Sequence, residues 1–270
     1  MFMTNTMAHP DEYWQGLEVA YKAVYSDRQD VWLPWEWSDE YRLRNTIYPM
    51  YLSIPLRIAR YLGLDSNAAV RTIPYLAHLP LVILNDIFFW KFAKRLVSKD
   101  NARLGFALFF VNRFQTSYMI RTGTNAVEQF FNCLSFYFYL DQKDKFTAKT
   151  AILTALISTS FMIRNTSPVG WIPLLAHKVI FDGSFMPFLK AGIIIALPVI
   201  ALCVYVDTVM YQSDTWVFTS YNFLEMNILH GLSKYFGEDP WWWYWICILP
   251  LDLHIIYPFL PFAIGGHLRT

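Results

Sequence analysis

The chain has 270 residues, of which 55% are hydrophobic, 19% are aromatic and only 16% carry a charge. About a quarter of the residues in an ordinary soluble domain are charged, so this composition excludes such a domain and predicts a membrane protein. The formal net charge of +1 excludes the strongly basic surface that attracts nucleic acids.

Two segments before residue 70 are predicted to be amphipathic helices at a membrane surface. The first begins in HPDEYWQGLEVAY (9–21), where apolar residues recur at helical spacing. The second, TIYPMYLSIPLRIARYLG (46–63), contains two prolines and two arginines, which favour a bent interfacial segment over a clean span. We therefore expect residues 1–69 to form a loop region that carries interfacial helices.

Apolar runs dominate the rest of the chain. A helix needs roughly 20 residues to cross about 30 Å of hydrocarbon, and seven runs come near that length. These are 70–92, 103–120, 124–140, 148–163, 169–181, 187–206 and 241–264. The sequence thus predicts an all-α, polytopic helical bundle of about seven spans over residues 70–270, with a polar loop near 207–240.

Clusters of basic residues predict the orientation of this bundle. One lies at 91–103 and contains three lysines and two arginines, and a second lies at 143–149 and contains three lysines. By the positive-inside rule both loops face the cytosol. Counting spans outward then places four polar segments on the opposite, luminal face, namely 1–69, 121–123, 164–168 and 207–240.

The stretch HPDEYWQ (9–15) places two adjacent carboxylates, Asp11 and Glu12, at the start of the first predicted helix. Acids are common in a first turn, because the positive end of the helix favours them. A carboxylate held at a membrane surface and partly shielded from water could also act as a general base. Both roles are compatible with this stretch.

The stretch MIRTGTNAVE (119–128) spaces Arg121, Asn125 and Glu128 by four and three residues, which predicts that they share one face of a helix. An arginine that snorkels at a helix end would explain Arg121 alone. A glutamate inside an apolar run is costly without a partner, however. An anionic lipid phosphate near Arg121 would explain both placements.

The remaining polar features are more ambiguous. Arg164 begins RNTSP (164–168), which is typical of a capped turn. His9 and His230 lack neighbours at metal-ligand spacing, so we expect no metal site. Three cysteines lie far apart in apolar runs, which predicts packing roles for Cys133, Cys203 and Cys247.

Six stretches together carry a family resemblance. They are HPDEYWQGLEVAYKAVY, WEW, RLRNTIYP, IRTGTNAVE, SFMIRNTSPVGWIPLL and YNFLEMNILHGLSKYFGEDPWWWY, in this order over roughly residues 9–245. The chain resembles the dolichyl-phosphate-mannose-dependent mannosyltransferases of glycosyltransferase family 22. Within that family the match is best for the branch that adds the third mannose of glycosylphosphatidylinositol (GPI) anchors.

This resemblance implies a multi-pass GT-C enzyme of the endoplasmic reticulum membrane with a luminal site. The donor would be dolichyl-phosphate mannose and the acceptor a GPI precursor, joined in an α1,2 linkage with inversion and without a cofactor or metal. It implies that Asp11 is the general base, that Glu12 orients the sugar and that Arg121 meets the leaving phosphate. The substrate-binding set that it implies is Arg121, Asn125, Glu128, Arg164, His9, Tyr13 and Trp14.

Three departures from the family pattern leave alternatives open. Arg164-Asn165-Thr166 stands where Arg-Pro-Thr is usual, PWWWY (240–244) lacks a histidine, and the family's His-Lys-Glu-Phe-Arg-Phe motif is missing. We therefore expect a chain truncated at both ends or internally spliced. One alternative is a catalytically inactive fragment or lipid-binding scaffold of this family, and another is an α-mannosyltransferase that acts on the lipid-linked oligosaccharide of N-glycans. A transporter of inverted repeats would show two similar halves, and the sequence has no such repeat.

Overall fold

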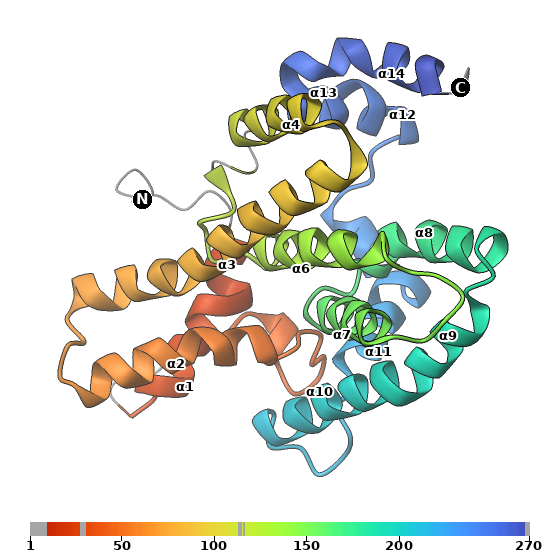
Figure 1. Ribbon diagram of the computed structural model, residues 1–270. Helices are drawn as coiled ribbons and strands as arrows, with labels where there is room; N and C mark the ends of the chain where they lie inside the picture. Colours follow the sequence, from red (N-terminus) through yellow and green to blue (C-terminus); the bar gives the residue numbers. More distant parts are fainter. Residues whose placement is uncertain (1–9, 28–30, 113–114, 116, 268–270) are drawn as a thin grey trace.

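The computed structural model describes residues 10–27, 31–112, 115 and 117–267, and no strand occurs among them (Figure 1). The predicted all-α class is therefore confirmed for the described part of the chain. Helices satisfy their own backbone polar groups, which a segment exposed to lipid requires.

The N-terminal helices form the best-buried core of the molecule. A π-helical turn η1 (Tyr13–Leu17) runs directly into α1 (Glu18–Tyr25), which packs against α2 (Ile47–Tyr61). A short 3-10 turn, η2 (Trp35–Trp37), lies between them in the chain. Ala20, Leu52 and Leu56 are completely buried at the α1–α2 contact. The segment expected to be bent is a single helix with Pro55 inside it, and its place at a membrane surface stays a prediction.

Gly16 allows η1 to approach α2 closely. A Cβ atom on Gly16 would lie 2.7 Å from Cε1 of Tyr48. The Tyr48 ring cannot move away easily, because it is buried and its hydroxyl is 2.7 Å from Nε2 of His78. The absence of a side chain at position 16 is thus a packing requirement.

Gly16→Ala is expected to lower the free energy of unfolding by about 1–3 kcal/mol, the usual cost of overpacking. Gly105→Ala is the matched control, since Gly105 lies within a helix and a Cβ atom there would meet nothing within 4 Å. That change should stabilise the chain by about 0.5–1 kcal/mol. Thermal unfolding of both variants in detergent measures the difference, and equal effects would show that the contact with Tyr48 is unimportant.

The longest helices are the ones suited to cross a membrane. Helix α3 (Asn67–Leu96) has 30 residues, and α9 (Phe185–Ala191), η3 (Gly192–Ala196) and α10 (Leu197–Met210) join into one helix of 26 residues. Both are long and apolar enough for a span, and a third span is possible if the bent pair Trp241–Leu251 and Ile256–Phe262 is counted as one. These counts cover the described residues, so the expected total of about seven spans stays a prediction.

Shorter helices occupy the other expected runs. They are α4 (Lys99–Val111), α6 (Thr124–Tyr139), α7 (Ala148–Ile163) and α8 (Pro168–Phe181). After α10 the described chain forms α11 (Thr219–Leu224), η4 (Glu225–Leu229), η5 (Leu232–Phe236), α12 (Trp241–Trp243), η6 (Tyr244–Ile248), α13 (Leu249–Leu253), η7 (His254–Phe259) and α14 (Leu260–His267). Helices α6 and α7 lie side by side near the centre of the molecule, and α6 also packs against α3 (Figure 1).

The two basic loops meet at one end of this helix group. Asp141, which follows α6, accepts a hydrogen bond from Lys149 Nζ at 2.7 Å and pairs with Arg95 at the end of α3. Hydrogen bonding from Arg95 lowers the pKa of Asp141 to about 2. The polar segments that precede α6 and follow α7 therefore lie at the opposite end of the same two helices.

Candidate active site

A buried ion pair joins the N-terminal helix to the loop that precedes α6. Arg121 Nη1 lies 3.3 Å from Oε1 and 3.2 Å from Oε2 of Glu12, with only 10% of the Arg121 side chain and 4% of the Glu12 side chain exposed. The Thr122 hydroxyl donates to the backbone carbonyl of Glu12 at 3.2 Å. The first predicted motif is therefore bound to the second across 109 residues of chain.

A second ion pair lies beside the first. Arg164, which follows the last turn of α7, places Nε 2.7 Å from Oε2 of Glu128 on α6. Thr124 links the second pair to the N-terminal helix, because its hydroxyl donates to Oε1 of Gln15 at 3.2 Å and accepts from Arg164 Nη1 at 3.4 Å. We define the polar cluster as Glu12, Gln15, Arg121, Thr122, Thr124, Glu128 and Arg164.

The predicted helical face is wrong in one respect. Helix α6 begins at Thr124, after the turn at Gly123, so Arg121 precedes the helix and cannot share a face with Asn125 and Glu128. Arg121 contacts Glu12, Glu128 contacts Arg164, and Asn125 is exposed. The costly glutamate does have a partner, as expected, but that partner is Arg164.

The predicted residues of the N-terminal motif occupy different environments. The helix starts as expected, because the Pro10 carbonyl accepts from the amides of Tyr13 and Trp14 at 3.0 and 3.2 Å. Glu12 is buried, whereas Asp11 is half-buried. His9 lies outside the described residues. Asp11 is therefore the more exposed acid of this pair.

A cavity of about 870 Å³ adjoins this motif. Tyr13 and Trp14 line it together with Glu18, and Asp65 and Arg71 lie across it near the start of α3. Burial raises the pKa of the Glu18 carboxyl. The volume is in the range that small-molecule and cofactor sites use. Tyr13 and Trp14, which the resemblance assigned to substrate binding, therefore both line a space large enough for a sugar.

A second buried acid joins the later loop to this end of the molecule. Asp207, near the end of α10, is completely buried and accepts hydrogen bonds at 2.8–3.0 Å from Asn45, Thr46 and Thr219. Ser220 in turn donates to Oδ1 of Asn165 at 2.8 Å. Hydrogen bonds thus connect the four segments that span counting placed on one face: 1–69 contacts both 121–123 and 207–240, and 207–240 contacts 164–168.

Sequence reasoning missed most of these partners. Gln15, Thr122 and Thr124 stand within quoted motifs, yet no pattern marked them as partners of the charged residues.

Among the described residues no group of three or more His, Cys, Asp or Glu side chains is placed to hold a metal ion. Cys133, Cys203 and Cys247 are free thiols, and the first two are buried.

These observations define the class of the protein. It is a helical membrane protein with the buried polar cluster at one end of its helices. The chain belongs to the Alg9-like mannosyltransferase family, whose model matches residues 1–270. This finding confirms the resemblance that the motifs carried.

Individual relatives agree with that assignment. GPI alpha-1,2-mannosyltransferase 3 of Bos taurus is 30% identical over 98% of this chain and 47% of its own length, and the Homo sapiens protein of that name is 29% identical over 98% and 46%. GPI mannosyltransferase 3 of Yarrowia lipolytica is 26% identical over 97% and 50%. The chain thus spans about half the length of these curated relatives. No solved structure matches it.

Proposed function

We propose that this chain is a mannosyltransferase that adds the third mannose, in an α1,2 linkage and with inversion, to a GPI precursor in the lumen of the endoplasmic reticulum. The donor is dolichyl-phosphate mannose. The observation that carries the proposal is the Glu12–Arg121 pair, which fixes the segment that carries Asp11 at the start of the helix whose Tyr13 and Trp14 line the cavity. The names of the relatives indicate the linkage and the acceptor.

The proposed reaction uses Asp11 as its base. The Asp11 carboxylate accepts the proton of the acceptor hydroxyl while that oxygen forms a bond to the anomeric carbon of mannose. The bond from the anomeric carbon to the phosphate oxygen breaks, and dolichyl phosphate leaves with the electron pair. As in glycoside hydrolysis, the transition state resembles an oxocarbenium ion, so a nearby carboxylate also stabilises it.

The contacts of the polar cluster change the role that the resemblance implied for Arg121, which was to meet the leaving phosphate. Arg121 is engaged by Glu12 and also donates through Nε to the Ser117 carbonyl at 3.0 Å. We therefore assign Arg121 and Glu12 a positioning role, in which Arg121 fixes the segment that carries Asp11. Arg71 is exposed and lines the same cavity, so it is the cation that we place against the leaving phosphate.

The proposed topology is that of a multi-pass protein of about seven spans with the GT-C arrangement. Two contacts support it. The basic loops meet at Asp141, which is consistent with one cytosolic end. The polar cluster and the Asp207 network lie at the other end, which would then be luminal.

The test is mannose transfer in membranes that lack the native enzyme. The chain is expected to extend a two-mannose GPI precursor by one mannose, and an α1,2-specific mannosidase should remove that sugar again. Membranes without the chain are the control. Two results would contradict the proposal. One is a well-expressed chain that gives no product, which would indicate an inactive lipid-binding relative. The other is extension of a lipid-linked N-glycan precursor instead.

A further inference from the structure

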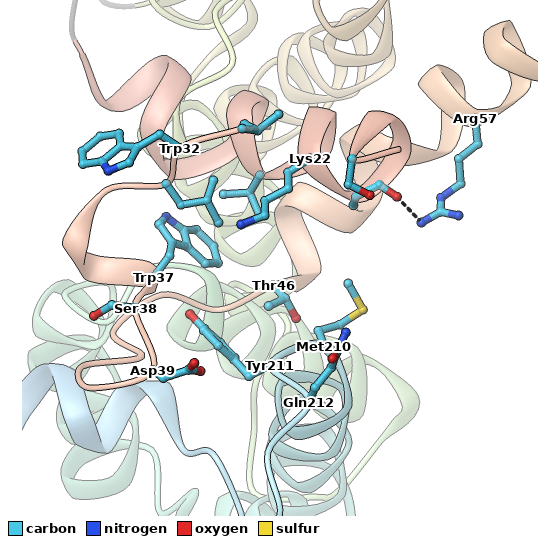
Figure 2. Close-up of a pocket in the computed structure, with 15 residues that line it drawn as sticks. Lys22, Trp32, Trp37, Ser38, Asp39, Thr46, Arg57, Met210, Tyr211 and Gln212 are labelled. Carbon is cyan, nitrogen blue, oxygen red and sulfur yellow. Dashed lines mark hydrogen bonds between the residues drawn. The ribbon is translucent and has the colours of Figure 1, made fainter. Parts of the chain in front are cut away.

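Two further cavities lie near the one lined by Tyr13 and Trp14, and the first of them shares Val31 and Trp32 with it. The first, of about 790 Å³, lies between α1, the segment 31–39 and the end of α10 (Figure 2). The second, of about 500 Å³, lies between α2 and α10. Arg57 and Met210 line both cavities, so the two spaces meet at these residues.

The first cavity carries uncompensated positive charge. Lys22 and Arg57 line it, and among the described residues neither has an acidic partner; Arg57 donates only to the Ala23 carbonyl, at 3.0 Å (Figure 2). The acid on the opposite wall, Asp39, is already paired with Arg42 at 3.2 Å. The charge of the first cavity therefore favours an anion.

An acid that follows α1 is also neutralised. Asp27, which follows α1, forms a two-pronged pair with Arg60, with Nη1–Oδ1 and Nη2–Oδ2 distances of 2.9 and 2.6 Å. Two cations on adjacent helices suit a phosphate, which accepts hydrogen bonds from both lysine and arginine.

The second cavity is lined almost entirely by apolar side chains. Ile54 on α2 is 55% exposed and Leu202 on α10 is 62% exposed. Val206 on α10 lines the same cavity. The α10 wall belongs to a helix long and apolar enough to span a membrane. A hydrocarbon chain would cover these side chains, whereas a small soluble anion would leave them uncovered.

The tryptophan at the mouth agrees with a membrane-surface location. Trp32 lines the first cavity and is 74% exposed. Amphipathic indole rings are enriched at the headgroup level of a bilayer. A polar cavity beside an apolar groove, with an exposed tryptophan at the entrance, matches the division of a lipid into headgroup and chain.

We propose that these cavities hold one anionic phospholipid, with its headgroup in the cavity that Lys22 and Arg57 line and one hydrocarbon chain against Ile54 and Leu202. The first cavity adjoins the one lined by Tyr13 and Trp14, because Val31 and Trp32 line both, but Lys22, Arg57, Ile54 and Leu202 line only the two cavities proposed for the lipid. The lipid site does not depend on the proposed transferase activity, and its occupancy is measured by binding alone.

The headgroup test compares lipids in native mass spectrometry of the full chain released from nanodiscs. The chain is expected to retain phosphatidylinositol about 25-fold better than phosphatidylcholine with the same acyl chains, since each of the two surface cations near an anionic headgroup contributes roughly fivefold. Combining Lys22→Gln with Arg57→Gln should abolish that preference. Combining Lys145→Gln with Lys190→Gln should preserve it, because these exposed lysines line neither cavity.

The chain test uses neighbouring positions on α10. Met210→Trp should fill the junction of the cavities and reduce retention of both lipids at least fivefold, whereas Val209→Trp, on a residue that lines neither cavity, should not. Circular dichroism and thermal unfolding establish that each variant is folded. Equal retention of the two lipids, or an unchanged preference in the Lys22/Arg57 variant, would overturn the proposal. So would competition by free glycerophosphoinositol as effective as that of the intact lipid, because the apolar groove would then be unused.

Discussion

Arg121→Met is expected to lower the free energy of unfolding by about 3–5 kcal/mol, because it leaves a carboxylate buried without its cation. Glu12 is 3% exposed, and Arg121 is a cation that pairs with it. Methionine keeps much of the length of the side chain, so lost packing contributes little. Denaturant titration in detergent, followed by tryptophan fluorescence, measures the loss.

An exposed pair provides the control for this prediction. Arg103 pairs with Asp100 at 3.0 Å, but the two side chains are 61% and 87% exposed. Arg103→Met should therefore cost less than about 1 kcal/mol. Adding Glu12→Gln to Arg121→Met should recover part of the stability, since the buried charge is then removed. If Arg121→Met costs no more than Arg103→Met, the Glu12–Arg121 pair does not hold the helix to the loop.

The helices themselves could be predicted because long apolar runs carry a strong local signal. The expected spans 70–92 and 187–206 fall within the two longest helices, α3 and the α9–α10 helix. Their ends were harder to place, because caps such as Ser66, which accepts from the amide of Ala69, decide the boundary. A local signal therefore identifies the element but not its exact length.

The partners within the site could not be predicted to the same degree. Composition shows that a charged residue in an apolar run needs a partner, but it does not say which one. The assignment of Arg121 to the face of Glu128 failed because Gly123 stands at the start of α6 and separates the two. Pairs such as Glu12–Arg121 and Asp207–Thr46 join residues more than 100 positions apart. Tertiary packing alone brings them together.

Tertiary contacts also give different roles to Asp11 and Glu12, the two acids of the N-terminal motif. Glu12 holds the fold through Arg121, so Glu12→Gln should lower the amount of folded protein together with the activity. Asp11 is half-buried beside the cavity-lining Tyr13. Loss of its charge should affect the chemistry much more than the fold.

Asp11→Asn is accordingly expected to reduce mannose transfer at least about 100-fold at an unchanged protein level, because the amide keeps the shape of the side chain but cannot accept the proton. Asp214→Asn is the matched control, since Asp214 is an exposed acid that lines none of the three cavities discussed above. Transfer per folded molecule, measured with donor and acceptor at saturation, separates the two effects. If Asp11→Asn lowers the protein level as much as the transfer, Asp11 serves the start of the helix, and the base must be another residue.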